Sequence, residues 1–266
     1  MLIRHNLHQH TNLSTCGHRD ATVEGVIRSA EAAGLERLAI TDHLSAPDKD
    51  REQQFFQRTE ELTRIDHEID VLLGAEICMP HIGWLPASDE FLEWVSFLFV
   101  AVNHYGDDRD QPKTRDEEGY AAHHVEMLHA AIDLKADVVA HPFTICGAKN
   151  PLDRDKLEES LSKQDLRGLF RAAANTNMAF EFNMTPGKRL SDQFVAEIIS
   201  LAQSVGTKFT FGSDGHDDPS AGYGGERGPR EQLDAHFASL GLTEDDILQN
   251  PARQPTMTTA AHGGHL

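Results

Sequence analysis

Short apolar runs alternate with amphipathic helical segments along most of this chain, and this alternation limits the folds that it can adopt. The strand-like runs lie at residues 2–8, 37–41, 71–75, 95–102, 137–140, 178–182 and 207–211. The helix-like segments lie at about 22–33, 50–68, 117–135, 164–175 and 191–205. Because strands that alternate with helices pair in parallel, about seven β–α units predict a parallel sheet that closes, or nearly closes, into a barrel.

The predicted fold class is therefore α/β and TIM-barrel-like, and its main alternative is a doubly wound open sheet. An open sheet would spread the strand ends along a line, whereas a barrel gathers them at one mouth, where functional residues lie. We expect residues 1–253 to form a single domain and residues 254–266 to form a loose C-terminal tail.

The composition argues against several classes of function. The formal net charge of −19 repels nucleic-acid phosphates, so nucleic acid is not an expected partner. No run approaches the ~18 consecutive apolar residues of a membrane span. The three cysteines form no Cys-x-x-Cys pair, and no secretory signal is recognised, so we expect a reducing, cytoplasmic setting. The sequence leaves the oligomeric state open.

Metal-binding side chains follow the predicted strands. His8 and His10 lie two positions apart on a strand, so both side chains point to one face. On its own, such a pair is equally well explained as two buried histidines with satisfied ring nitrogens. The other strand ends enlarge the set to His8, His10, His18, His43, Glu76, His104, His141, Asp214 and His216. This mixed set is too large for one ion and suits two or three divalent ions of zinc, manganese or iron.

The order of these motifs resembles that of the PHP (polymerase and histidinol phosphatase) family. The motifs are His8-x-His10-Thr11, Thr41-Asp42-His43, Gly74-x-Glu76, His104, His141-Pro142 and Gly212-Ser213-Asp214-x-His216. The resemblance covers residue 6 to about residue 225, and the Cys16-Gly17-His18 turn is similar to the histidinol-phosphatase branch. The family implies a distorted seven-stranded barrel that holds three metal ions.

The resemblance also implies a ligand set for each ion. The first ion would be held by His8, His10, Glu76 and Asp214, and Glu76 would bridge to a second ion held by His104 and His141. The third would be held by His18, His43 and His216, with Asp20 as the substitute for His18. Asp42 would orient an imidazole, as partners of metal-bound histidines do. Its alternative role is that of a turn or cap residue.

A metal-dependent phosphoesterase that acts on a small phosphorylated metabolite is the function that these features favour. Hydroxide bound to the metals would attack phosphorus, and Asp214 or a nearby histidine such as His216 would shuttle the proton. The substrate is left open among histidinol phosphate, nucleotides and sugar phosphates. The cations expected to bind phosphate are Arg109, Lys188 and Arg227, although each is individually also explained as a solvated surface charge.

Three other functions remain as alternatives. A nuclease or exonuclease of the same family is disfavoured by the acidic charge. A metal hydrolase similar to amidohydrolases would act on a substrate without phosphate. A non-catalytic metal-binding protein would not need the complete ligand set.

Overall fold

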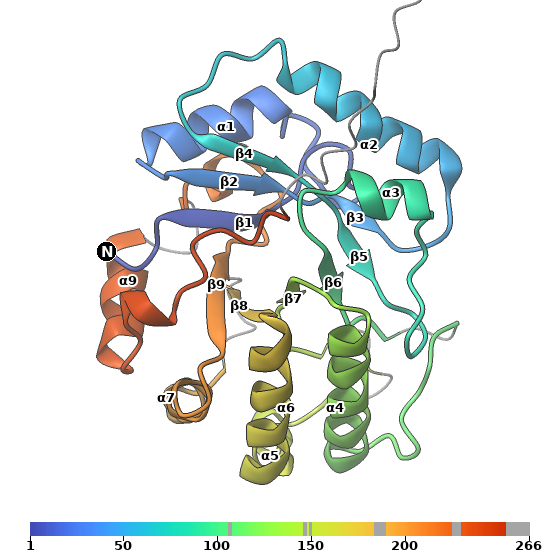
Figure 1. Cartoon of the computed structure of the whole chain (residues 1–266), viewed down its shortest axis with the longest axis vertical. Coiled ribbons are helices and arrows are strands. Elements are labelled where there is room, and N and C mark those ends of the chain that lie inside the picture. Colours follow the sequence, from blue (N-terminus) through green and yellow to red (C-terminus); the bar gives the residue numbers. More distant parts are fainter. Residues whose placement is uncertain (106–107, 146–147, 149–150, 184–189, 225–229, 254–266) are drawn as a thin grey trace, which may run out of the picture.

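Nine short strands make up the centre of the computed structural model, which describes residues 1–105, 108–145, 148, 151–183, 190–224 and 230–253 (Figure 1). The strands are β1 (His5–Gln9), β2 (Arg37–Ile40), β3 (His43–Leu44), β4 (Asp70–Leu73), β5 (Glu76–Cys78), β6 (Phe99–Ala101), β7 (Val138–Ala140), β8 (Ala179–Asn183) and β9 (Lys208–Gly212). All of their pairings are parallel. The predicted tail and part of the predicted site lie outside the described residues.

The nine strands follow seven paths, because two paths are interrupted at the site. Thr41 and Asp42 separate β2 from β3, and Gly74 and Ala75 separate β4 from β5. Pairing follows the order β1-β2-β4 in one sheet and β3-β5-β6-β7-β8-β9 in the other. The amide of Glu76 donates to the carbonyl oxygens of Thr41 (3.2 Å) and Asp42 (3.0 Å). These hydrogen bonds connect the two neighbouring paths at the point where both strands are interrupted.

The first and last paths meet beside each other, as in a barrel. Gln9 and Gly215 form a parallel bridge. The amide of His10 donates to the Gly215 carbonyl at 2.8 Å, and the amide of Asp214 donates to the His8 carbonyl at 2.9 Å. The predicted α/β barrel architecture is confirmed, with distortion where the strands break. Hydrogen bonding runs through two sheets and this bridge rather than through one continuous ladder.

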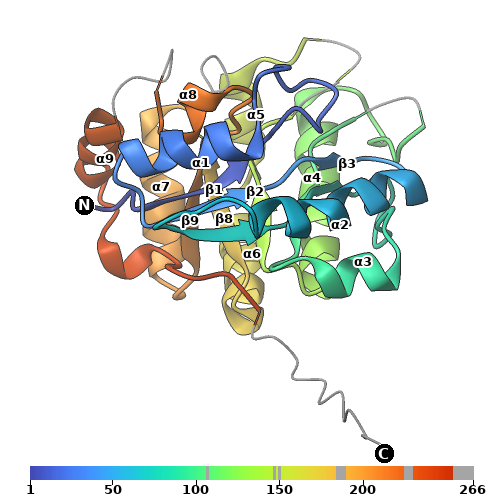
Figure 2. The same cartoon turned by 90° about the horizontal axis from the view of Figure 1, so that it is seen from above.

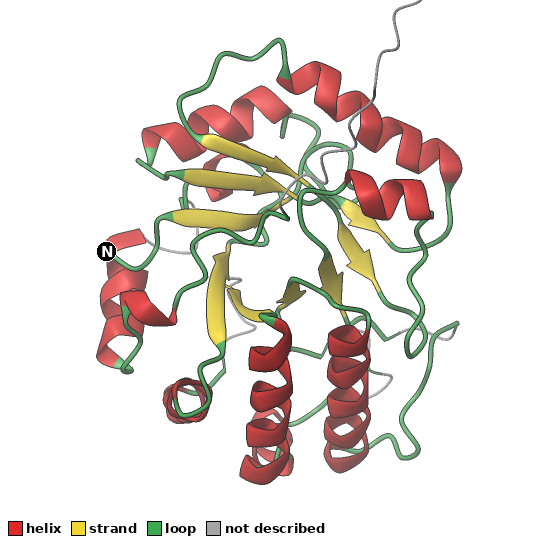
Figure 3. Cartoon of the chain, in the orientation of Figure 1, coloured by secondary structure: helices red, strands yellow, loops and turns green. Residues whose placement is uncertain are grey.

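Helices surround the strands (Figures 1 and 3). They are α1 (Val23–Ala32), α2 (Lys49–Leu62), α3 (Asp89–Trp94), α4 (Glu117–Asp133), α5 (Arg154–Ser160), α6 (Lys163–Thr176), α7 (Asp192–Gln203), α8 (Asp218–Ala221) and α9 (Arg230–Ser239). Figure 2 shows α1, α2 and α3 along one side of the strands, with α6 behind them. Among the described residues, no helix combines the length and apolar character needed to cross a membrane.

Local sequence signals explain where the helices begin. Thr22 caps α1 by accepting from the Gly25 amide at 3.0 Å, and Ser191 caps α7 by accepting from the Phe194 amide at 3.2 Å. Each such cap stabilises a helix by about 1 kcal/mol. At the other end of α6, Asn177 adopts a left-handed conformation with φ of 58°, which stops the helix before β8.

Among the described residues, the buried apolar side chains form two clusters. The larger one joins the strands to the surrounding helices. The smaller one draws on alternate positions, such as Phe99 and Ala101 of β6 and Val138 and Ala140 of β7, as expected for side chains inside a barrel. The ring of His8 packs edge-to-face on Phe99, with 4.8 Å between centroids. The smaller cluster therefore packs against the candidate site, which is described below.

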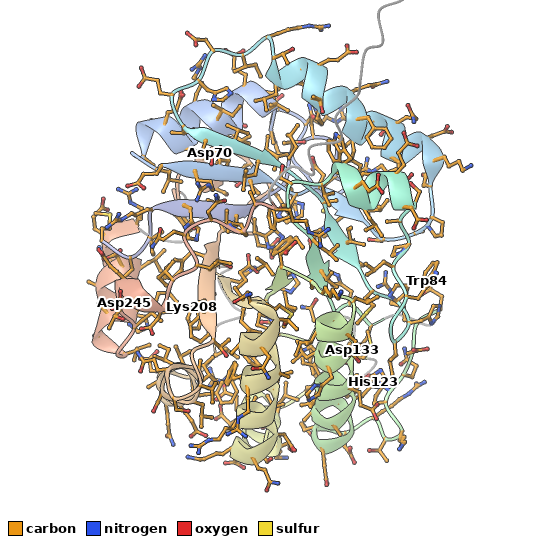
Figure 4. The ribbon with its side chains drawn as sticks, viewed as in Figure 1. Asp70, Trp84, His123, Asp133, Lys208 and Asp245 are labelled. Atoms are coloured by element: carbon orange, nitrogen blue, oxygen red, sulfur yellow. The ribbon has the colours of Figure 1, made fainter. Side chains whose placement is uncertain are left out.

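The site lies at the carboxyl ends of the strands. Asp70 and Lys208, labelled in Figure 4, mark the starts of β4 and β9. The chemically active side chains follow the opposite ends of these and the other strands, so the barrel brings together residues that are more than two hundred positions apart.

Candidate metal centre

Glu76 lies at the middle of a cluster of histidines and is fully buried. Its Oε1 atom is 3.0 Å from His141 Nε2. Its Oε2 atom is 2.9 Å from His43 Nδ1 and 3.3 Å from His8 Nε2. His104 Nδ1 lies 4.0 Å from Oε1. The two oxygens of this carboxylate therefore face two different groups of imidazoles.

Asp214 completes the cluster from the opposite end of the chain. Its Oδ1 atom is 3.2 Å from His10 Nε2 and 3.6 Å from His8 Nε2. Asp214 has φ of 51° and His141 has φ of 29°, both in the left-handed region that non-glycine residues rarely adopt. Such backbone conformations persist where the surroundings enforce them, and they gather at functional sites.

Glu181 fixes the orientation of His8. The buried Glu181 carboxylate lies 2.9 Å from His8 Nδ1 and accepts from the His141 amide at 2.7 Å. Since a carboxylate only accepts hydrogen bonds, His8 Nδ1 carries a proton and Nε2 faces the cluster. A Cβ atom at Gly212 would lie 1.7 Å from Glu181 Oε1 and 2.5 Å from His8 Cβ. Only a glycine at this position leaves room for the pair.

The buried donors face one another in a way that calls for a cation. His8 Nε2 and His10 Nε2 are 3.1 Å apart, and both point at carboxylate oxygens. Two imidazole nitrogens bound to one zinc ion would lie about 3.3 Å apart, given Zn–N bonds of roughly 2.0–2.1 Å. The donor chemistry and spacing therefore fit a metal ion.

The electrostatics agree with this interpretation. Burial disfavours the carboxylates of Glu76 and Asp214, but the charge of His8 and the other imidazoles outweighs burial and holds both pKa values well below their usual range. Burial likewise opposes a charge on His8, yet Glu181, Asp214 and Glu76 raise its pKa well above the ordinary value. The cluster thus favours positive charge at its centre.

Four groups of described side chains have ligand atoms close enough to share an ion. They are His10–His43–His216, His8–His10–Glu76, His43–Glu76–Cys78 and Glu76–His104–His141. The structure thus brings together eight of the nine predicted ligands, because Asp214 also contacts His8 and His10.

The structure does not bring the ninth, His18, to this cluster. The His18 side chain is 66% exposed and lies 3.7 Å from Asp20, whose side chain is 89% exposed. Instead, the Cys16 sulfur is 3.1 Å from His216 Nε2. Burial raises the pKa of the Cys16 thiol, but hydrogen bonding with His216 and His43, together with their charges, outweighs burial and lowers it to about 6.

Sequence reasoning missed three residues at the site: Cys16, Cys78 and Glu181. The Cys78 sulfur is buried, 3.2 Å from His104 Nδ1. The available signal was position, since Cys78 follows Glu76 by two residues and Glu181 sits in a strand whose end faces the others. Cys78 was weighed only as a disulfide partner, and His18 rather than Cys16 was the expected ligand in the Cys16-Gly17-His18 turn. The spacing of Glu181 matches no ligand motif.

Asp42 lies beneath the centre and holds the loop after β1. Its carboxylate accepts from the amide and hydroxyl of Thr11, both at 2.7 Å, and from the amide (3.0 Å) and hydroxyl (2.7 Å) of Ser14. The Ser14 oxygen in turn lies 3.2 Å from His10 Nδ1 and accepts from the His43 amide at 3.1 Å. Asp42 thus reaches two imidazole-bearing residues through Ser14.

Known proteins are similar to this chain in sequence and in architecture. A protein named "Probable phosphatase" from Aeromonas salmonicida is 27% identical over 256 residues, which cover 93% of this chain and 89% of the relative. A second one from Aliivibrio fischeri is 26% identical over 216 residues, which cover 78% of this chain and 76% of the relative. The family model of the PHP domain matches residues 6–185, more than half of the chain.

The chain belongs to the PHP domain family. The solved structure of histidinol phosphate phosphatase from Lactococcus lactis, in complex with zinc, L-histidinol and phosphate, shares its fold. The TM-score is 0.62 at 17% identity, over 91% of this chain and 95% of the other. The names of these relatives support the conclusion that this chain is a hydrolase.

Of the three predicted phosphate-binding cations, the structure describes Arg109. Lys188 and Arg227 are outside the described residues. Arg109 is half-buried, and within the described part of the chain its buried Nη1 atom has no hydrogen-bond partner. Two further arginines contact the loops that carry ligands. Arg51 donates to the His43 carbonyl at 3.4 Å, and Arg58 donates to Thr11 Oγ1 at 3.0 Å.

A cavity of about 220 Å³ opens beside the candidate metal centre. His141 and Glu181 form the wall nearest to the candidate ligands. The remaining lining is largely apolar and includes Phe143, Phe182 and Phe237. An organic group that enters this cavity would lie next to the ligand cluster.

Proposed function

We propose that this PHP domain is a metal-dependent phosphoesterase that hydrolyses a small phosphorylated metabolite. The observation that carries the proposal is the convergence of buried carboxylates and imidazole nitrogens on one another at 2.9–3.6 Å, around Glu76, His8 and Asp214. Divalent cations among these donors would stabilise the buried carboxylates and would supply the chemistry of hydrolysis.

The positions of the donor atoms suggest which residues would bind each of two or three ions. His8, His10, Glu76 and Asp214 form one set, and Glu76, His104 and His141 form a second. Glu76 belongs to both because its two oxygens face different imidazoles. His43 and His216 belong to a third set. When bound, the ions supply Lewis acids for the phosphoryl oxygens and lower the pKa of water.

The protein residues then have distinct roles. Glu181 keeps His8 in one tautomer. Asp214, whose pKa the neighbouring imidazoles hold low, would be a carboxylate at neutral pH and would take the proton from attacking water. His216 is 34% exposed and its Nδ1 lies 4.0 Å from Asp214 Oδ1, so solvent that takes up the proton reaches this edge of the cluster.

A substrate screen tests the proposal. The purified protein, loaded with zinc or manganese, is offered histidinol phosphate, nucleotides and sugar phosphates, and release of inorganic phosphate is measured. Histidinol phosphate is included because the Lactococcus lactis neighbour was solved with L-histidinol and phosphate. We expect release from at least one compound and none from the Glu76→Gln variant. A metal-loaded protein that releases phosphate from none of them contradicts the proposal.

A further inference from the structure

The turn after β1 presents a thiol to the exposed edge of the centre. Cys16 Sγ lies 3.1 Å from His216 Nε2. The His18 ring, two residues further on, is largely exposed. The residue that reaches the edge of the cluster is therefore a cysteine and not the histidine of the same turn.

The backbone of the turn is tied on both sides of Cys16. The amide of Gly17 donates to the Ser14 carbonyl at 3.0 Å, and the amide of His18 donates to the His216 carbonyl at 2.7 Å. A Cβ atom at position 17 would lie 2.1 Å from the Thr11 carbonyl oxygen, so the turn requires glycine there. These constraints place the sulfur beside His216 as part of the fold.

The neighbouring imidazoles are arranged as ligands. His216 Nδ1 lies 2.9 Å from the Asp214 carbonyl oxygen, which can only accept, so Nδ1 carries the proton and the Nε2 lone pair faces Cys16. His10, His43 and His216 already form a group whose nitrogens could share an ion. Sulfur and nitrogen ligands of one tetrahedral zinc would lie about 3.6 Å apart, from Zn–S of about 2.3 Å and Zn–N of about 2.0–2.1 Å. The observed 3.1 Å needs only a small side-chain adjustment.

We propose that Cys16 is a thiolate ligand of the outermost metal ion, which it shares with His43 and His216. This assignment rests on the metal centre of the proposed function and adds a donor that no histidine motif supplies. A thiolate is a soft ligand, so it selects zinc over manganese at this position. The competing explanation is a simple hydrogen bond from the Cys16 thiol to His216.

Cobalt substitution separates these explanations. A thiolate bound to Co²⁺ gives a charge-transfer absorption band in the near ultraviolet, which imidazole and carboxylate ligands do not give. We expect this band in the wild type and in His18→Ala, and its loss in Cys16→Ser. We also expect Cys16→Ser to bind its outermost ion at least about tenfold more weakly, since loss of even an outer partner of a ligand costs roughly 10–100-fold. Elemental analysis and cobalt titration measure this loss.

Two further variants keep the test decisive. Cys16→His, which restores a nitrogen donor, should recover the metal equivalent without the band, and circular dichroism checks that each variant is folded. A band that persists in Cys16→Ser, a wild type without any band, or a band that is lost only in Cys78→Ser overturns the proposal. The absorption band reports whether Cys16 binds the metal, and it does not depend on turnover. A failed substrate screen would therefore contradict the proposed function without deciding whether Cys16 is a ligand. A missing band would contradict the assignment of Cys16 without affecting the measurement of phosphate release.

Discussion

The buried part of the centre and its exposed edge are built from similar ligands but in different surroundings. The inner group consists of His8, His10, Glu76, His141 and Asp214, whose side chains are 0–8% exposed. The outer group consists of Cys16, His43 and His216, in which the His43 and His216 side chains are 23% and 34% exposed and Cys16 is exposed. Solvent therefore reaches the outer group more readily than the inner one.

If ions bind at both groups, this difference would separate their structural role from their chemical role. Burying carboxylates without a compensating cation is costly, so ions at the inner group should stabilise the fold as well as bind tightly. An ion at the outer group can exchange with solvent and is accessible to a substrate. The following predictions test that separation.

The largest expected effect comes from Glu76→Gln. We expect this variant to lose the inner ions, the phosphatase activity and about 3–5 kcal/mol of unfolding free energy, the range for removing one partner of a buried charged pair. Urea unfolding and elemental analysis measure both losses. Glu60→Gln is the matched control, because the Glu60 side chain is 77% exposed and its ion pair with Arg64 lies at the surface. Equal stability of the two variants would contradict the account.

Stepwise chelation should separate the two groups next. We expect the first equivalent of metal to leave with little change in Tm, because it comes from the outer group. Removal of the remaining ions should lower Tm by roughly 5–10 °C, from about 2.7 kcal/mol of binding-linked stability and roughly 2–4 °C per kcal/mol. Calorimetry at each metal content gives the result. A Tm that falls in equal steps would remove the distinction between the groups.

Glu181→Gln should weaken the inner group selectively. The variant removes the charge that orients His8 but keeps the size of the side chain. Loss of such a partner typically lowers metal affinity by about 10–100-fold. Metal titration should show this change at the inner ions and no change in the cobalt–thiolate band of the outer one. A loss of that band in Glu181→Gln would show that the two groups are not independent.

Asp42→Asn should have the smallest effect. Its carboxylate accepts four hydrogen bonds from Thr11 and Ser14, and an amide cannot accept all of them in the same way. We expect a loss of about 1–3 kcal/mol in unfolding free energy and little change in the inner ions. Urea unfolding together with metal analysis measures these quantities. Abolished metal binding would assign Asp42 a direct role in the centre.

The sequence predicted the inner group because strand periodicity determines where its members lie. His8, His141 and Asp214 follow apolar runs, and the parallel order of a barrel brings such ends together whatever the details of the loops. The same logic predicted the seven strand paths. It could not show that Thr41–Asp42 and Gly74–Ala75 interrupt two paths, because a short polar or small residue pair is compatible with a continuous strand.

The sequence predicted the outer group less completely than the inner one, because the position of Cys16 depends on a turn rather than on a strand. Which of Cys16 and His18 faces inward is decided by two hydrogen bonds, one from the Gly17 amide to the nearby Ser14 carbonyl and one from the His18 amide to His216, which is distant in the chain. Glu181 was missed for a related reason. A buried carboxylate that supports a histidine has no spacing of its own, and only the folded barrel places it beside His8.

Anomalous diffraction from crystals of the metal-loaded protein tests the central claim most directly. The account predicts strong anomalous peaks among His8, His10, Glu76, His141 and Asp214, with a weaker, exchangeable one beside His43 and His216. A protein that crystallises in the described fold after zinc loading, yet shows no anomalous peak between Glu76 and Asp214, would contradict it.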